Sequence, residues 1–179
     1  MSNCVSLCQN KFYICPVNIV CLMHTFIGTY EVRLDPKGRV LVPAVLKKQM
    51  GNAVEEGFVM KRSPFQKCLE IYTLKDWQET IEGFSKINRY IKENADFIRQ
   101  FTSGLKMTEL DSMGRVLIAK DLQIFAGLDK DMVLNCNMNI IEVWDKAAYE
   151  KAVSIDYEDF SKKTEEILGK LYENGTNIS

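Results

Sequence analysis

Two aspartates, Asp35 and Asp111, occupy equivalent places in two similar segments, and their side chains are of the type that a two-carboxylate catalytic site needs. They open the segments Asp35-Pro36-Lys37-Gly38 and Asp111-Ser112-Met113-Gly114. A pair of carboxylates can act as acid and base in hydrolysis. An aspartate that opens a tight turn also has a simpler role, because its side chain accepts hydrogen bonds from turn amides. The sequence favours this second role and predicts a structural turn motif formed by Asp35, Gly38, Asp111, Gly114 and Arg115.

Other catalytic arrangements are not expected. His24 is the one histidine, so a histidine-based acid–base or nucleophilic centre has no fixed partner. The sequence has no Gly-rich phosphate loop, no His-x-x-x-His metal pair and no nucleophile elbow. Cys68 and Cys136 fall in apolar stretches, which is typical of small core residues with reduced thiols. We therefore expect no enzyme, metal, cofactor or small-molecule substrate.

A basic stretch over residues 33–48 is the strongest candidate for a binding surface. It holds five basic side chains against one acidic residue, and the five are Arg33, Lys37, Arg39, Lys47 and Lys48. The matching stretch 109–124 has two basic and three acidic residues, and residues 142–179 have five lysines against nine acidic residues. Arginine can contact phosphates through two N–H groups or bind guanine edges, and lysine adds charge. We therefore expect the five side chains to face DNA.

Whole-chain composition limits the class of protein. The chain has 179 residues, a formal net charge of −1 and 46% hydrophobic residues. These values favour one or two folded domains and argue against a disordered, collagen-like or polytopic membrane protein. The near-neutral total also lacks the strongly basic signature of many nucleic-acid-binding proteins. No apolar stretch is long enough to span a membrane, so we expect a cytoplasmic protein.

The elements that must position these residues occur twice. Residues 28–42 recur as residues 104–118, so that Arg39 corresponds to Arg115 at an offset of 76 residues. Farther along, Glu70-Ile71-Tyr72 aligns with Glu142-Val143-Trp144 at an offset of 72 residues. The sequence therefore predicts a duplicated unit, with a first repeat over residues 23–102, a second over residues 103–173 and a tail over residues 174–179.

Local patterns predict similar elements in each repeat. Alternating or β-branched apolar residues indicate strands over residues 30–34, 40–42, 58–60, 69–72, 132–135 and 140–144. Glycines end two short helices over residues 44–50 and 120–126. Thr73 and Asp76 resemble a capping box, and the apolar spacing behind them predicts a helix whose apolar face runs from Leu74 to Ile91. Further helices are predicted over residues 95–101, 146–153 and 157–172.

Residues 1–22 differ from the rest, because they hold four of the six cysteines and a single charge, Lys11. A secretory signal would need a continuous apolar run, which Asn10, Pro16 and Asn18 interrupt. A zinc site would need close cysteine pairs, and no Cys-x-x-Cys is present. We expect residues 1–22 to be a disordered extension or the product of a mis-assigned start, with Met23 as the working first residue.

The duplicated motifs resemble those of a known family. Gly28-x-Tyr-x-x-x-Leu-Asp35-x-Lys37-Gly38-Arg39-x-x-x-Pro43 is similar to the opening of the MraZ family, and Leu110-Asp111-x-x-Gly114-Arg115 is similar to its second copy of the signature. The resemblance covers about residues 23–171. One motif would indicate only the broader AbrB-like group, and two copies are more specific. Ala119 departs from the pattern, because a proline is expected there.

The resemblance implies an α+β fold, a duplicated swapped-hairpin double-split β-barrel of the SpoVT-AbrB-like superfamily with helices after each repeat. It implies a ring-shaped homo-oligomer without cofactors. It also implies a bacterial, nucleoid-associated transcriptional regulator, expected to be a repressor, that binds repeated sites on double-stranded DNA upstream of the division and cell-wall gene cluster. Arg39 matches the family arginine associated with DNA contact.

Two further expectations follow. Arg39→Ala should nearly abolish DNA binding, whereas Arg115→Ala should affect folding or assembly more. A rival interpretation is a non-catalytic oligomeric scaffold for protein partners, in which the basic stretch is a solvated surface. RNA binding is a third interpretation, although the sequence shows no RNP-like aromatic platform.

Overall fold

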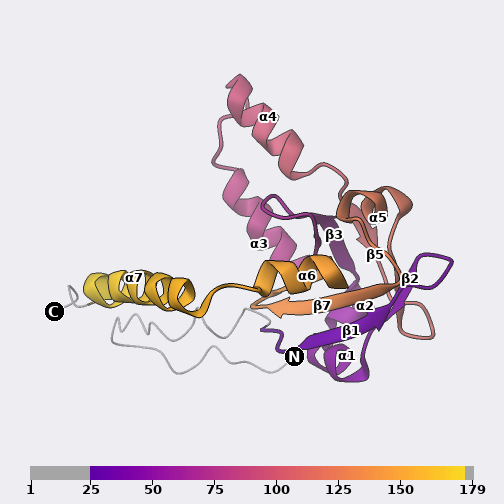
Figure 1. Cartoon of the computed structure of the whole chain (residues 1–179). Coiled ribbons are helices and arrows are strands. Elements are labelled where there is room, and N and C mark those ends of the chain that lie inside the picture. Colours follow the sequence, from indigo (N-terminus) through magenta and orange to yellow (C-terminus); the bar gives the residue numbers. More distant parts are fainter. Residues whose placement is uncertain (1–24, 176–179) are drawn as a thin grey trace, which may run out of the picture.

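The computed structural model describes residues 25–175, so the expectations for residues 1–22 lie outside the described part (Figure 1). This part holds eight strands: β1 Thr29–Arg33, β2 Arg39–Leu41, β3 Phe58–Arg62, β4 Leu69–Thr73, β5 Lys106–Thr108, β6 Arg115–Leu117, β7 Asp131–Asn137 and β8 Ile140–Asp145. It also holds seven helices: α1 Ala44–Met50, α2 Ala53–Glu56, α3 Leu74–Phe84, α4 Lys92–Phe101, α5 Lys120–Ala126, α6 Lys146–Val153 and α7 Tyr157–Gly175. The α+β class is confirmed.

The sheets join the two repeats. The larger sheet is antiparallel with the order β1-β7-β8-β4-β3-β5, and a second, two-stranded sheet pairs β2 with β6. The counterparts in the two repeats are β1 and β5, β3 and β7, and β4 and β8. If each strand of the larger sheet is replaced by its counterpart, the same strand order results, read from the opposite edge. The first strand of each repeat therefore pairs with a strand of the other repeat: β1 with β7, and β5 with β3.

One apolar core lies beneath both repeats. It includes equivalent residues of the duplicated unit that are almost fully buried, namely Val40 with Val116, Val42 with Ile118, and Leu46 with Leu122. Burying a valine, leucine or isoleucine side chain contributes about 1.5–3 kcal/mol relative to leaving it exposed. The shared core and the shared sheet fix the position of one repeat against the other.

The short helices have the bounds that the sequence predicts. Helix α1 ends at Met50 before Gly51, and α5 ends at Ala126 before Gly127. The residue that precedes each helix has nearly the same backbone, with φ −55° and ψ 139° at Pro43 and φ −61° and ψ 145° at Ala119. Alanine therefore adopts the proline-like conformation here, and its departure from the family pattern leaves the path of the chain unchanged.

The helix predicted from Leu74 to Ile91 is wrong in its second half. Thr73 caps α3 as predicted, and its Oγ1 accepts a hydrogen bond from the Asp76 N–H. Helix α3 ends at Phe84, because polar side chains beyond this point bond to the backbone and compete with helical hydrogen bonds. The Ser85 hydroxyl donates to the Glu82 carbonyl at 2.6 Å, and the Asn88 side chain accepts from the Tyr90 N–H at 3.0 Å. The chain turns, and α4 begins at Lys92.

Helices α3 and α4 form an arm that projects from the sheet, and α7 extends away from the sheet in a different direction (Figure 1). The loops that precede β2 and β6 project on the opposite side of the view from α7. None of the helices within residues 25–175 combines the length and the apolar character needed to cross a membrane.

Candidate nucleic-acid interface

Turn 1 (residues 35–38) is built around the carboxylate of Asp35. Its Oδ1 accepts hydrogen bonds from the backbone N–H groups of Lys37 at 2.8 Å and Arg39 at 2.9 Å. Its Oδ2 accepts from the Arg39 side chain, from Nε at 2.8 Å and from Nη2 at 2.7 Å. The aspartate thus holds both the turn and the orientation of the arginine that follows it.

Turn 2 (residues 111–114) repeats this arrangement in the second repeat. Asp111 Oδ1 accepts from the backbone N–H groups of Met113 and Arg115, each at 2.9 Å. Asp111 Oδ2 accepts from the Arg115 side chain, from Nε at 2.8 Å and from Nη2 at 2.7 Å. The side chain of Arg39 is 27% exposed and that of Arg115 is 30% exposed. By local geometry alone, the two arginines are therefore equivalent.

The arginines shift the ionisation of both aspartates. Hydrogen bonds from the Arg39 side chain, and then from its backbone N–H, hold the pKa of Asp35 below its usual value. The same bonds from Arg115 lower the pKa of Asp111 to about 2. A carboxyl whose pKa is lower in the folded state stabilises the fold above its unfolded-state pKa, and this contribution disappears as the pH falls through the folded-state pKa.

We predict that Asp111→Asn removes part of the acid sensitivity of the fold. The variant should melt at a lower temperature than the wild type at pH 7, because its side chain no longer forms the ion pair with Arg115. The difference should shrink from about pH 4 to about pH 2, where Asp111 becomes protonated. Thermal unfolding followed by circular dichroism from pH 7 to pH 2 measures this. The matched control is Asp129→Asn, at an exposed aspartate; a pH-independent difference for Asp111→Asn contradicts the prediction.

Each turn accepts a backbone hydrogen bond from the other repeat. Turn 1 accepts it from the residue after β6, and turn 2 accepts it from the residue after β2. The Ile118 N–H donates to the Gly38 carbonyl at 2.8 Å, and the Val42 N–H donates to the Gly114 carbonyl at 3.0 Å. Gly38 has φ 78°, and a Cβ added there would lie 2.3 Å from Gln123 Nε2 and 3.2 Å from the Ile118 carbonyl. The positive φ therefore favours glycine here, and the close Ile118 carbonyl leaves little room for a side chain.

The pairing of β2 with β6 creates an exposed face, which we call the β2–β6 face. Val40 and Val116 point into the core, so the residues on either side of them point outward. The register places Arg39 opposite Leu117 and Leu41 opposite Arg115. This face thus carries two arginines and two leucines, and Leu41 and Leu117 are 58% and 56% exposed. Turn 1 adds the exposed Lys37, and turn 2 adds the exposed Met113.

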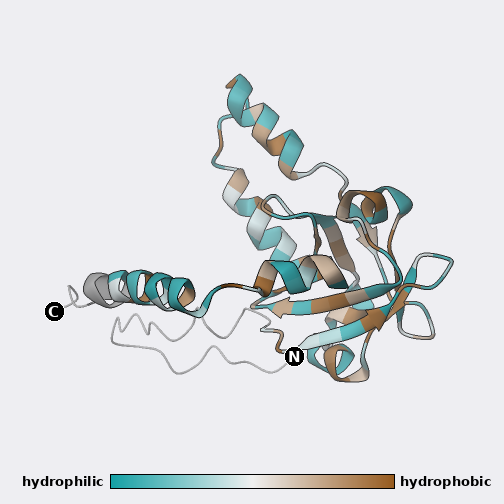
Figure 2. Ribbon diagram, in the orientation of Figure 1, coloured by the Kyte–Doolittle hydropathy of each residue, from teal (hydrophilic) through white to brown (hydrophobic). Residues whose placement is uncertain are grey.

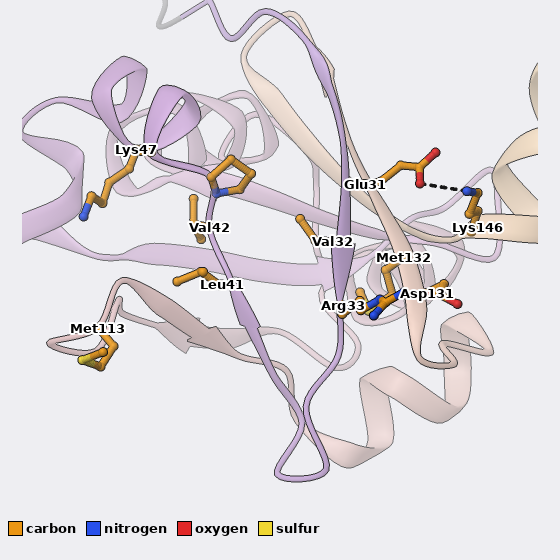
Figure 3. A pocket seen from close by; sticks show the side chains of 12 residues that line it. Glu31, Val32, Arg33, Leu41, Val42, Lys47, Met113, Asp131, Met132 and Lys146 are labelled. Atoms are coloured by element: carbon orange, nitrogen blue, oxygen red, sulfur yellow. Dashed lines mark hydrogen bonds and ion pairs between the residues drawn. The ribbon is translucent and has the colours of Figure 1, made fainter.

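The structure divides the five predicted DNA-contact residues among three places. Lys37 and Arg39 belong to turn 1 and its strand. Arg33 and Lys47 line a groove of about 780 Å³ whose apolar walls include Leu41, Val42, Pro43 and Met113 (Figure 3). Lys48 is exposed on α1 and does not line this groove. Lys47 lies beside turn 2, with its Nζ 3.4 Å from the position that a Cβ of Gly114 would occupy.

Ion pairs offset part of the positive charge in the groove. Arg33 Nε lies 3.1 Å from Asp131 Oδ1. Lys146 Nζ lies 2.8 Å from Glu31 Oε2, and this hydrogen bond raises the pKa of the lysine. Within residues 25–175, Lys37, Lys47 and Lys48 form no ion pair, so their charges are available to a polyanion. No sequence pattern indicates Lys146, which reaches the groove from the second repeat.

The described residues offer no arrangement for metal or thiol chemistry. No three His, Cys, Asp or Glu side chains within residues 25–175 gather closely enough to hold a metal ion. Cys68 is buried and Cys136 is half-buried, and neither forms a disulfide in this part of the chain. Burial raises the pKa of Cys68 to about 12 and that of Cys136 to about 11, so both thiols stay protonated at neutral pH.

Comparisons with known proteins agree with the duplication. The family model for the MraZ protein matches residues 25–100 and again residues 101–171. The chain is 48% identical over 157 residues to the transcriptional regulator MraZ of Flavobacterium psychrophilum, covering 88% of this chain and 100% of that protein. It is 46% identical over 147 residues to the same-named protein of Christiangramia forsetii, covering 82% and 95%. It is 33% identical over 144 residues to that of Clostridium beijerinckii, covering 79% and 98%.

Proposed function

This chain belongs to the MraZ family of transcriptional regulators, and we propose that it regulates transcription by binding double-stranded DNA through turn 1, β2 and α1. The single observation that carries the proposal is the arrangement of Arg39. Asp35 engages its Nε and Nη2, so the guanidinium is held in place at an exposed face while its other N–H groups stay available. An arginine that is already oriented loses less conformational freedom when it binds phosphate or a guanine edge.

Net positive charge at this edge comes from the lysines. The ion pair between Arg39 and Asp35 is close to neutral, so attraction of phosphate depends on Lys37, Lys47 and Lys48. The equivalent positions in the second repeat are Met113, Gln123 and Ile124, none of which is charged. The first repeat thus supplies the lysines, with Lys37 in turn 1 and Lys47 beside turn 2, and this favours the first repeat as the DNA-contacting one and the second repeat as structural support.

We further propose the assembly and the target that the family resemblance implies. The exchange of strands between repeats supports a duplicated swapped-hairpin double-split β-barrel as the fold. One basic edge per chain binds weakly, so a ring of several copies on repeated sites would raise avidity by about 10²–10⁴. The proposed target is the promoter of the division and cell-wall gene cluster. The proposed action is repression by a cytoplasmic, nucleoid-associated protein without catalysis or a cofactor.

A gel shift with the DNA upstream of the protein's own gene tests this function. We expect that DNA to shift at a lower protein concentration than a shuffled fragment of the same length. Affinity should fall about 10³-fold or more between 50 and 200 mM salt if six or more phosphates are contacted, because each neutralised phosphate releases counterions. Equal affinity for both fragments would remove the sequence-specific role.

A scaffold for protein partners is the second candidate, and one observation favours it. Leu41, Leu117 and Met113 are 58%, 56% and 67% exposed on or beside the β2–β6 face. Exposed apolar side chains that cluster often mark protein interfaces. The absence of any sequence-preferring shift in the same experiment would favour this candidate.

A further inference from the structure

Helix α7 has an apolar stripe that nothing in the single chain covers. Phe160, Ile167 and Leu168 are spaced at i, i+7 and i+8, with Thr164 between them at i+4, so they share one face of the helix. The three apolar side chains are 56%, 61% and 46% exposed. Figure 2 shows hydrophobic positions among hydrophilic ones along this helix. Most helices in proteins owe their stability to packing of such an apolar face, and in the single chain the apolar face of α7 has no packing partner among the described residues.

The arm offers an apolar groove of matching character. Residues of α3 and α4, together with the turn after α3, line a groove of about 350 Å³, and its apolar members are Trp77, Ile81, Phe84 and Ile98. Ring contacts brace the groove from behind, because Phe101 lies 6.3 Å from Trp77 and 4.7 Å from Phe84, measured between ring centroids. Phe97, next to Ile98 on α4, is 48% exposed. The groove is therefore firm, open and apolar.

The stripe and the groove lie apart within one chain. Helix α7 follows α6 after residues 154–156, and it extends away from both the sheet and the arm (Figure 1). A contact between two different surfaces of neighbouring copies is a head-to-tail contact. Such a contact closes into a ring when the rotation between neighbours allows it.

Charge is compatible with this contact. The groove lining includes one acidic and one basic side chain, Glu82 and Arg89. Neither forms an ion pair within the described residues. Helix α7 carries Lys163 on one side of its stripe and Glu165 on the other. Each surface can therefore offer an opposite charge to the other at the edge of an apolar contact.

We propose that α7 of one copy docks its Phe160–Thr164–Ile167–Leu168 stripe into the α3–α4 groove of the next copy. This inference rests on the proposed ring and names the surfaces that build it. The docked helix uses anchors at i, i+4 and i+7, which is the usual pattern for a helix in an apolar groove. Both surfaces lie outside the DNA-contacting edge, so assembly leaves turn 1 free.

Size-exclusion chromatography with light scattering on the full chain tests the docking. The stripe variant is Ile167→Asp, which changes an exposed residue and should leave the single chain folded. The groove variant is Ile81→Asp, and the matched control is Lys162→Asp on the opposite face of α7. We expect the wild type and Lys162→Asp to have the mass of several chains, and each of the other two variants to have the mass of one chain. Circular dichroism checks that every variant is folded.

Mixing the two disrupted variants gives the sharpest result. Ile81→Asp keeps an intact α7 and Ile167→Asp keeps an intact groove, so an equal mixture should form one contact and have the mass of two chains. An Ile167→Asp protein that keeps the wild-type mass would overturn the docking while leaving the ring and the DNA-binding function standing. A wild type with the mass of one chain would instead remove the ring itself, and the docking with it.

Discussion

Replacing Lys61 with methionine is expected to lower the free energy of unfolding by about 3–5 kcal/mol, which is the usual cost of removing one partner from a buried ion pair. Lys61 is fully buried, and its Nζ lies 2.9 Å from Glu70 Oε2. The same carboxylate oxygen accepts a hydrogen bond from the Tyr72 hydroxyl at 2.8 Å. Lys61 Nζ also lies 4.2 Å from the ring centroid of Phe101, which links the ion pair to the arm.

The neighbouring strand makes the loss more severe. Glu70 is directly opposite Lys61 in the pairing of β3 with β4 and directly opposite Glu142 in the pairing of β4 with β8, so the ion pair of Lys61 balances a carboxylate that faces a second one. Without it, a buried carboxylate faces another carboxylate in an environment of low dielectric constant. Urea unfolding of the variant at neutral pH measures the effect.

The second repeat provides a matched control for Lys61. Asn135 is its counterpart, and its Nδ2 donates to Glu142 Oε2 at 3.0 Å. Asn135→Met removes a neutral donor and should cost about 1–3 kcal/mol. The double variant Lys61→Met with Glu70→Leu should recover most of the lost stability, because both charges are gone. If Lys61→Met costs less than Asn135→Met, the buried pair does not have the role assigned to it.

Much of the local structure could be predicted because its signals are local. Gly51 and Gly127 mark the ends of α1 and α5, and Thr73 marks the start of α3. The end of α3 was missed because apolar spacing continues through Ile87 and Ile91, while polar side chains at Ser85 and Asn88 redirect the backbone. Periodicity gives no information about this competition.

Long-range contacts could not be read from local patterns. The predicted strand covers only the apolar residues 58–60, yet β3 continues through Lys61 to Arg62, although a lysine is seldom buried. The lysine is buried because Glu70, on the neighbouring strand, pairs with it. In the same way, the basic stretch over residues 33–48 predicted a binding edge, but it did not indicate that Asp35 and Arg39 pair or that Lys146 joins the groove.

Arg39→Ala is expected to reduce affinity for the upstream DNA about 100-fold or more. One arginine that contacts phosphate or a base edge contributes about 1–3 kcal/mol, and the loss is repeated in every copy that touches DNA. Truncation also removes the hydrogen bonds from Arg39 to Asp35, so some stability of turn 1 is lost with the DNA contact.

Arg115→Ala is the matched control for the loss of turn stability. Arg115 forms the same hydrogen bonds to Asp111 at the same distances, and its exposure is nearly equal to that of Arg39. Both variants should therefore melt at similarly reduced temperatures. The difference between them lies within their own turns, because turn 1 carries Lys37 where turn 2 carries the uncharged Met113.

Fluorescence anisotropy of the labelled upstream fragment, titrated with the wild type and each variant at one salt concentration, compares the two arginines directly. If turn 1 contacts DNA and turn 2 supports the fold, Arg39→Ala loses affinity about 100-fold or more, while Arg115→Ala stays within about tenfold of the wild type. An equal loss of affinity in both variants, with assembly intact in both, would contradict the assignment of DNA contact to the first repeat.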